Sequence, residues 1–215
     1  MNKTLALCLT LFASPLAAHP HIFVNTGLSF VLDGENRLTH VHVTWEYDEL
    51  YSLLVTEDMG VESDYDGVLN AEDIAVLTGF DMQWIEGYNG DLVGMVNGAS
   101  LRLSAPSAPT ATLRDGKIVT THLRAVEGAP KITEAAHFLP YDGTYYTAYE
   151  VRLPVEVQGG RGCAVAISEP DIEGALAMTK AELGALPMDF DMEAAGLGDI
   201  GRRFATEVKI TCAAQ

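Results

Sequence analysis

The chain has 215 residues, 48% of them hydrophobic, and a formal net charge of −17 at pH 7. Its length and apolar content suffice for one domain with a substantial core. Nucleic acid and anionic membrane surfaces would repel so acidic a chain, so we expect neither as a partner and regard cationic ligands, metal ions included, as better suited.

Residues 1–18 have the three parts of a secretory signal peptide. Lys3 precedes an apolar run at 5–12, and small residues lead to Ala18. The run is shorter than the about 20 apolar residues that span a bilayer, and no later stretch is long enough. We expect cleavage after Ala18, export to the periplasm and a single mature domain, 19–215, without stable membrane insertion. A buried N-terminal helix is the alternative.

Residues 20–32 and 37–47 predict two strands of an antiparallel hairpin, joined by a turn at 33–36. The second strand alternates, so its histidines and Glu46 share one face while its apolar and aromatic side chains share the other. A turn centred near residues 34–35 would place His21 opposite Asp48.

The period then changes to that of helices, predicted over 48–59 and about 71–85, and we expect a helix-loop-helix insertion over 48–86. The loop between them has the spacing of the twelve-residue calcium loop, with Gly67 at the turn position. Its candidate ligands, one of them a backbone carbonyl at Val68, are Glu62, Asp64, Asp66, Val68, Asn70 and Asp73. Glu at the first position and Asp at the last predict weak binding. The alternative is a solvated acidic turn in which Asn70 caps the second helix.

The rest of the chain is predicted to be mostly β, with one late helix over 171–185. The predicted strands cover 91–96, 99–104, 110–115, 117–126, 131–138, 145–157, 163–168 and 204–212. We therefore expect an α+β fold: a mostly antiparallel, β-sandwich-like body with an inserted EF-hand-like helix-loop-helix.

Two cysteines remain once the signal peptide is removed. Cys163 and Cys212 would most simply form a disulfide in an oxidising compartment, closing a loop of about 50 residues. A metal site made by the two cysteines is the alternative, but it lacks nearby histidines.

The predicted mature terminus brings a free amine and the ring of His19 together, which is a chelate suited to Ni²⁺, Co²⁺, Cu²⁺ or Zn²⁺. The predicted site comprises His19, His21, Glu46 and Asp48. His40 and His42 are interpreted as a solvated strand face or a second weak site. We interpret His122 and His137 as structural, although His122 could also reach the terminal site.

Recognisable catalytic motifs are absent from the sequence, which has no Gly-x-Ser-x-Gly, phosphate loop, dinucleotide fingerprint or His-Glu-x-x-His. We therefore expect a protein that is not an enzyme, with an oxidative copper enzyme as a remote alternative. The tyrosine-rich stretch 141–149 could line a pocket, although a turn entering a strand is the preferred interpretation.

Five segments together resemble a bacterial domain-of-unknown-function family described as the periplasmic component of an uncharacterised ABC-type transport system. The matching segments are 19–24, 45–52, 64–73, 141–149 and 208–212. Members of that family often accompany nickel/cobalt exporter-type membrane proteins. The resemblance therefore implies a divalent-metal-handling or transport-accessory protein whose partner is an inner-membrane metal transporter or exporter. The alternative is a calcium-stabilised solute-binding or protein-interaction module without transition-metal chemistry.

Overall fold

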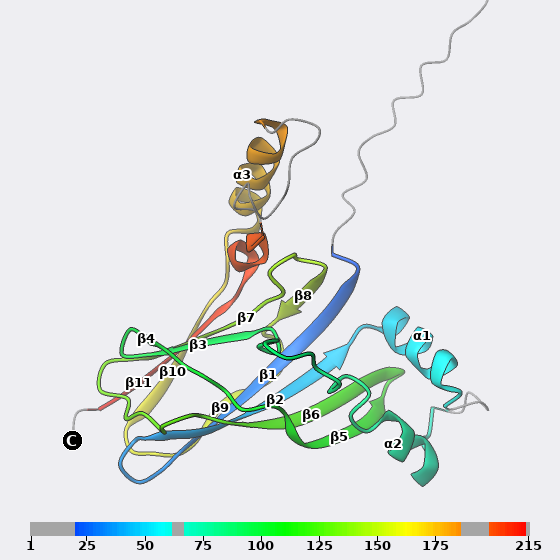
Figure 1. The fold of residues 1–215 in the computed structure, drawn as a ribbon, viewed down its shortest axis with the longest axis horizontal. Coiled ribbons are helices and arrows are strands. Elements are labelled where there is room, and N and C mark those ends of the chain that lie inside the picture. Colours follow the sequence, from blue (N-terminus) through cyan, green and yellow to red (C-terminus); the bar gives the residue numbers. More distant parts are fainter. Residues whose placement is uncertain (1–19, 62–66, 186–197, 214–215) are drawn as a thin grey trace, which may run out of the picture.

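The computed structural model describes residues 20–61, 67–185 and 198–213 (Figure 1). The predicted signal peptide, His19, Glu62, Asp64 and Asp66 lie outside the described residues. The strands are β1 (Ile22–Leu32), β2 (Leu38–Tyr47), β3 (Leu92–Val96), β4 (Ala99–Ser100), β5 (Ser107–Arg114), β6 (Lys117–Ala125), β7 (Ala136–Pro140), β8 (Thr147–Glu150), β9 (Val155–Gly159), β10 (Cys163–Ser168) and β11 (Glu207–Cys212). The helices are α1 (Glu49–Met59), α2 (Ala71–Leu77) and α3 (Ile172–Ala185), with a 3₁₀ helix, η1, at Ile200–Phe204.

The strands form two sheets. One has the order β5-β6-β2-β1-β8, with β9 also paired to β1, and the other has the order β10-β11-β7-β3-β4. All pairings are antiparallel except those of β1 with β8 and with β9. The predicted α+β class with a mostly antiparallel body is confirmed. Figure 1 shows α1 and α2 together beyond one end of the larger sheet, and α3 apart from them.

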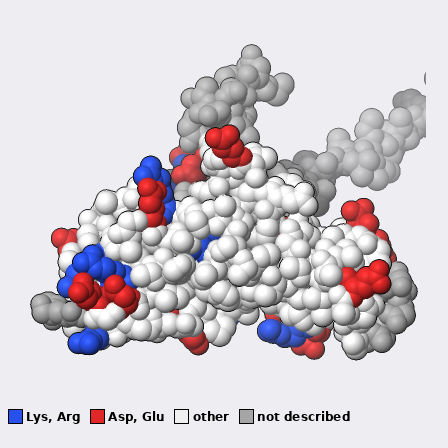
Figure 2. All heavy atoms as spheres, turned by 60° about the horizontal axis from the view of Figure 1, so that its bottom comes forward, with Lys and Arg blue, Asp and Glu red and all other residues white. Residues whose placement is uncertain are grey.

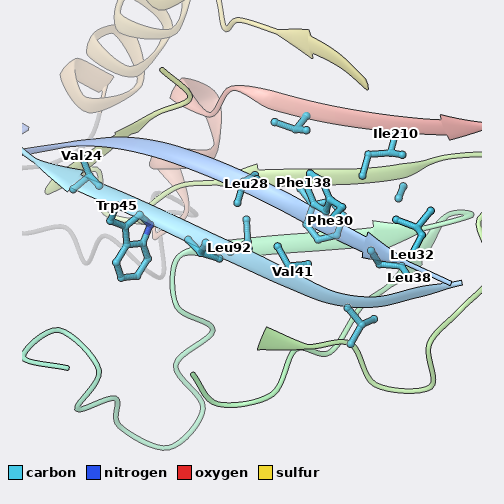
Figure 3. Close-up of a cluster of buried hydrophobic side chains, with 14 of the residues drawn as sticks. Val24, Leu28, Phe30, Leu32, Leu38, Val41, Trp45, Leu92, Phe138 and Ile210 are labelled. Atoms are coloured by element: carbon cyan, nitrogen blue, oxygen red, sulfur yellow. The ribbon is translucent and has the colours of Figure 1, made fainter. Parts of the chain in front are cut away.

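The core lies between the sheets because alternate residues of β1 and β2 turn the same way. Leu28, Phe30 and Val41 are almost completely buried, and so are Phe138 and Ile210 from the other sheet (Figure 3). The rings of Phe30 and Phe138 are 4.6 Å apart between centroids. Burial of each such side chain contributes about 1.5–3 kcal/mol. Contacts between these side chains hold the two sheets together.

The β1–β2 register differs from the predicted one. Val24 pairs with Tyr47 and Asn25 with Glu46, so the turn is centred one residue later than expected. The Asp33 carboxylate accepts the N–H groups of Glu35 (2.8 Å) and Arg37 (2.9 Å), which fixes a longer turn, and the ladder shifts at Val31/Leu32. The expectation that His21 lies opposite Asp48 was therefore wrong.

The first predicted helix is confirmed to within one residue, with Asp48 as its N-cap. The second helix was predicted to continue to residue 85 but ends at Leu77, before Gly79 with φ of +80°. The side chains of Phe80, Met82 and Trp84 then contact the core at every second position. This segment forms turns and not a continued helix, since the Met82 N–H donates to the Gly79 carbonyl at 3.1 Å. None of the helices within the described ranges has the length and apolarity needed to cross a membrane.

The single strand predicted over 145–157 is two strands, β8 and β9. The pairing with β1 is interrupted at Val151 and Arg152 and resumes at Leu153, whose N–H donates to the Thr26 carbonyl at 3.2 Å. This connection passes close to β1, because a Cβ atom at Gly27 would lie 2.9 Å from the Leu153 Cβ. The strand predicted over 131–138 is shifted to β7.

The predicted disulfide is present. Cys163 and Cys212 are directly opposite in the β10–β11 ladder, and their sulfur atoms are 2.07 Å apart. The bond closes a loop with a sequence separation of 49 residues. In the chain-entropy model such a loop contributes about 4 kcal/mol to the free energy of unfolding.

Charged side chains are distributed unevenly on the face shown in Figure 2. They gather mainly toward the periphery, and most of the middle is occupied by uncharged residues. The ion pair between Arg102 and Glu127 is among those on the surface, and both side chains are largely exposed. Exposed pairs of this kind contribute little stability, so the fold depends mainly on the core and the sheet ladders.

Candidate functional site

An aromatic pocket with a volume of about 200 Å³ lies near the junction of β1, β2, β8 and α1. Its aromatic lining consists of Trp45, Tyr47, Tyr51, Trp84, Tyr88 and Tyr149. Ile22 and Thr147, which are paired neighbours in β1 and β8, complete the wall together with Asp81. The lining residues come from four segments that are distant from one another in sequence, so the pocket forms only in the folded chain.

The floor of the aromatic pocket comes from β2. Trp45 and Tyr47 lie on the core face of that strand and are only 4% and 6% exposed. Figure 3 shows Trp45 near Val24, at one end of the core cluster. The Trp45 ring centroid is 5.7 Å from that of Tyr149 and 6.4 Å from that of Trp84. The pocket wall is therefore continuous with the core.

Asp81 supplies the pocket's carboxylate. Its Oδ2 accepts hydrogen bonds from the Tyr47 hydroxyl (2.8 Å) and the Thr120 hydroxyl (2.7 Å). Its Oδ1 is also buried but has no hydrogen-bond partner among the described residues. Burial raises the pKa of Asp81, and the bonds from Thr120 and Tyr47 act in the opposite direction.

A second carboxylate, that of Asp91, interacts with Tyr88 and Tyr149 of the pocket wall. Its Oδ2 accepts a 2.9 Å hydrogen bond from the Tyr149 hydroxyl. Burial raises the pKa of Asp91, while hydrogen bonds from Tyr88 and Tyr149 lower it. Burial, followed by the nearby Asp91 charge, raises the pKa of Tyr149 well above its ordinary value, so this phenol remains protonated. The O–H groups of Tyr47 and Tyr149 thus both donate to carboxylates.

His122 lies beneath the tryptophans. Its ring is 4.8 Å from that of Trp45 and 5.5 Å from that of Trp84, and the residue is 1% exposed. Neither ring nitrogen has a hydrogen-bond partner among the described residues. Burial, with smaller contributions from Arg124 and His42, lowers the pKa of His122 to about 3, so the ring is neutral at pH 7. The structural role expected for His122 agrees with this position.

Arg124 packs against the Trp84 ring and lines a neighbouring cavity. Its guanidinium carbon is 4.7 Å from the Trp84 ring centroid, and its N–H groups donate to the backbone carbonyls of Ser104 and, at 3.0 Å, Asn89. Gly90 permits this close packing, because a Cβ atom there would lie 2.3 Å from the Trp84 ring. The Arg124 charge is therefore compensated by backbone carbonyls and by the Trp84 ring.

The described members of the predicted transition-metal site do not converge. Asn25 donates to Glu46 at 2.9 Å and lies four residues, about 13 Å along the strand, from His21. Both Asp48 oxygens accept backbone N–H groups, from Tyr51 (2.9 Å) and Phe23 (2.8 Å). Across the ranges that the structure describes, no group of three His, Cys, Asp or Glu side chains could hold a metal ion. The pairing of His19 with His21 stays a prediction.

The other histidines are also separate from the terminal site. His42 pairs with Ser29 in the β1–β2 ladder, far from the start of β1. His137 Nδ1 is 2.9 Å from Glu207 Oε1, on the other sheet. His122 turns into the core and thus away from the strand face that carries Glu46.

In the predicted calcium loop, the structure describes Val68, Asn70 and Asp73. The Asn70 side chain accepts the N–H groups of Glu72 (2.8 Å) and Asp73 (3.1 Å), and the Asp73 carboxylate accepts that of Asn70 (3.2 Å). This reciprocal pair is a capping box at the start of α2. The capping role of Asn70 is confirmed, and calcium binding stays a prediction.

The tyrosine-rich stretch does not act as one unit. Tyr145 stacks on Phe204 with ring centroids 4.0 Å apart, while the Tyr146 ring lies 4.8 Å from that of His21. Only Tyr149 of this stretch is an aromatic wall of the pocket. The interpretation as a turn entering a strand thus describes most of the segment, and the pocket interpretation describes its last tyrosine.

Four residues of this region were not predicted from the sequence: Asp81, Trp84, Tyr88 and Asp91. Residues up to 85 were assigned to a helix, in which Asp81 would have had no relation to β2 or β6. The missed signal is Gly79, because a glycine just after the last residue of an apolar helical pattern is typical of a helix C-terminus.

A family model described as a protein of unknown function (DUF1007) matches residues 4–212, nearly the whole chain. No curated protein matches the chain. The pocket's chemistry must therefore be inferred from its own residues.

We predict that His122 makes stability fall at mildly acidic pH. Unfolding restores the ordinary histidine pKa of about 6.5, whereas the folded value is about 3, so the unfolded state binds the extra proton as pH falls. Urea unfolding at about pH 7.5 and about pH 5 should show the natural protein losing about 2 kcal/mol more than His122→Leu. Equal losses in the two proteins would contradict a neutral, desolvated His122.

Proposed function

Because the chain belongs to the DUF1007 family, described only as being of unknown function, we propose from its own residues that it is an exported solute-binding protein. The aromatic pocket is its ligand site. The observation that carries this proposal is an aromatic concavity with a buried carboxylate oxygen that no described residue satisfies. Binding sites for small molecules combine an apolar wall with a few placed polar groups in this way.

The size and rigidity of the aromatic pocket favour a small solute. About 200 Å³ is below the roughly 300–1,000 Å³ of sites for drug-sized ligands. Hydrogen bonds from Tyr47 and Thr120 fix Asp81, and the bond from Tyr149 to Asp91 fixes another wall. A wall that is fixed before binding reduces the entropy that a ligand must lose from the protein.

Export is supported by the N-terminal pattern of residues 1–18 and by the disulfide. Disulfides persist in oxidising compartments such as the periplasm, where they are not reduced by cytosolic thiols. A periplasmic protein with a solute-binding pocket can present a captured solute to a membrane partner.

Tryptophan fluorescence offers a direct test, because Trp45 and Trp84 are the only two tryptophans in the sequence and both line the aromatic pocket. We expect at least one member of a panel of small cationic, anionic and neutral solutes to change the emission saturably and to raise the melting temperature. Tyr51→Ala, which removes one pocket wall, should weaken that response about ten-fold or more.

Tyr141→Ala is the matched control for this test, because Tyr141 is an aromatic residue that does not line the aromatic pocket. It should leave the fluorescence response unchanged. If no solute in the panel altered emission or melting, or if Tyr51→Ala bound as tightly as the natural protein, the proposal would be wrong.

A second candidate is divalent-metal handling by the mature N-terminus, as a substrate-binding-like component of a nickel/cobalt-type transport system. It is favoured by the position of His21, whose N–H donates to the Tyr146 carbonyl at 2.8 Å, which anchors the backbone two residues after the predicted cleavage site. A terminal amine and imidazole on an anchored strand could bind Ni²⁺, Co²⁺, Cu²⁺ or Zn²⁺ and transfer it to an inner-membrane transporter.

Calorimetric titration of these metals into correctly processed protein tests the second candidate. We expect His19→Ala to weaken binding about ten-fold or more, because one of two chelating atoms is lost. His40→Ala should have no such effect, since His40 faces Val31 well along the hairpin. Indistinguishable weak binding by the natural protein and His19→Ala would remove the chelate from consideration.

We also propose that Ca²⁺ binds the acidic loop between α1 and α2 and thereby holds the two helices together. Asp73→Asn tests this, because the new amide oxygen can still accept the Asn70 N–H while the charged ligand is lost. We expect Ca²⁺ to raise the melting temperature of the natural protein, and of Asp58→Asn on the exposed side of α1, but not of Asp73→Asn. A shift that survives in Asp73→Asn would contradict the proposed site.

A further inference from the structure

We propose that the aromatic pocket selects a small organic cation, an alkylammonium ion, held by the faces of its rings and the carboxylate of Asp81. This inference rests on the proposed solute-binding function and names the class of solute. Three properties of the described residues carry it: the ring faces, the direction of the hydrogen bonds and the single charge in the lining.

The first property is the density of π-systems. Trp45, Trp84 and Tyr149 surround one small volume, with Trp45 5.7–6.4 Å from the other two rings. Aromatic faces carry partial negative charge and attract cations within about 6 Å, and alkylated ammonium ions suit such cages because they also bury apolar surface. A neutral apolar solute would fill the same space but would gain nothing from that charge.

The second property is that two of the four phenols that line the aromatic pocket already donate their O–H groups to carboxylates. Tyr47 donates its O–H to Asp81 at 2.8 Å, and Tyr149 donates its O–H to Asp91 at 2.9 Å. Each phenol has one proton to donate, so what these two oxygens still offer a ligand is acceptor capacity. An anion would require donors from the wall, whereas an ammonium ion is complementary to acceptors.

The third property is charge. Asp81 is the one carboxylate in the lining, and the lining contains no Lys, Arg or His among the residues that the structure describes. The unsatisfied Oδ1 of Asp81 lies in a desolvated position where a nearby cation would offset the cost of burial. Arg124 is not such a partner, because its guanidinium donates to backbone carbonyls and lines a neighbouring cavity.

The ligand is an organic cation and not a bare metal ion. A hard metal ion needs several oxygen ligands, and the pocket offers one carboxylate. Its volume of about 200 Å³ equals that of roughly seven water molecules at liquid density, which suits a compact alkylammonium ion. The net charge of −17 would in addition favour the approach of cations.

The test compares choline with its uncharged isostere, 3,3-dimethylbutan-1-ol, and with acetate, by calorimetry on the mature protein. We expect choline to bind at least roughly ten-fold more tightly than the isostere, and acetate not to bind, because the shapes of the first two match and only the charge differs. This comparison uses the natural protein and does not depend on the folding of a variant.

Asp81→Asn removes the charge and keeps an oxygen that can accept from Tyr47 and Thr120, so it should weaken choline binding roughly ten-fold or more. Glu156→Gln, an equal change of charge at an exposed site on β9, should not weaken it. Choline binding at the same affinity as the isostere, undiminished binding by Asp81→Asn, or no choline binding at up to tens of millimolar would each overturn the inference.

The outcomes separate this inference from the proposed function. If a neutral or anionic solute altered the fluorescence of the natural protein while choline did not bind, the pocket would still be a solute site. The inference that it selects an organic cation would then be wrong. If no solute of any charge bound, the solute-binding function itself would be wrong as well.

Discussion

The Asp81 carboxylate joins the segment after α2 to the larger sheet. Its Oδ2 accepts from Tyr47 at the end of β2 and from Thr120 in β6, so it bridges two neighbouring strands. The same residue fixes Trp84, whose indole N–H donates to the Asp81 carbonyl at 2.7 Å. Burying a charge is costly unless it is compensated, and here Oδ2 is satisfied while the buried Oδ1 has no hydrogen-bond partner among the described residues.

Three other parts of the molecule complete the aromatic pocket around this bridge. The core of the two sheets supplies the rigid floor, since Trp45 and Tyr47 continue the alternation that buries Val41 and Val43. The capped helices α1 and α2 deliver Tyr51 and the segment after Leu77 to the end of the larger sheet. The neutral, buried His122 supports the tryptophans from below. An acceptor-lined aromatic pocket results, and its chemistry favours a small cation.

Elements with strong local signals could be predicted from the sequence. The α+β class, α1 to within one residue and the Cys163–Cys212 bond were predicted correctly, and Asn70 caps α2 as the alternative interpretation of the acidic loop had it. The candidate site was not, because Asp81 is defined by partners 34 and 39 residues away, which no local pattern indicates. Among the described members of the predicted metal set, Glu46 lies away from His21 and Asp48 is a helix cap, because a different turn moved the hairpin register; the pairing of His19 with His21 stays a prediction.

The account rests on a pocket that is formed by the fold and accepts a cation against its aromatic lining. The most direct measurement is a crystal structure of the mature protein grown with choline. We predict electron density for the ligand with its nitrogen within about 6 Å of the ring centroids of Trp45, Trp84 and Tyr149. Choline bound elsewhere, or an aromatic pocket collapsed or filled only by water in its presence, would contradict the account.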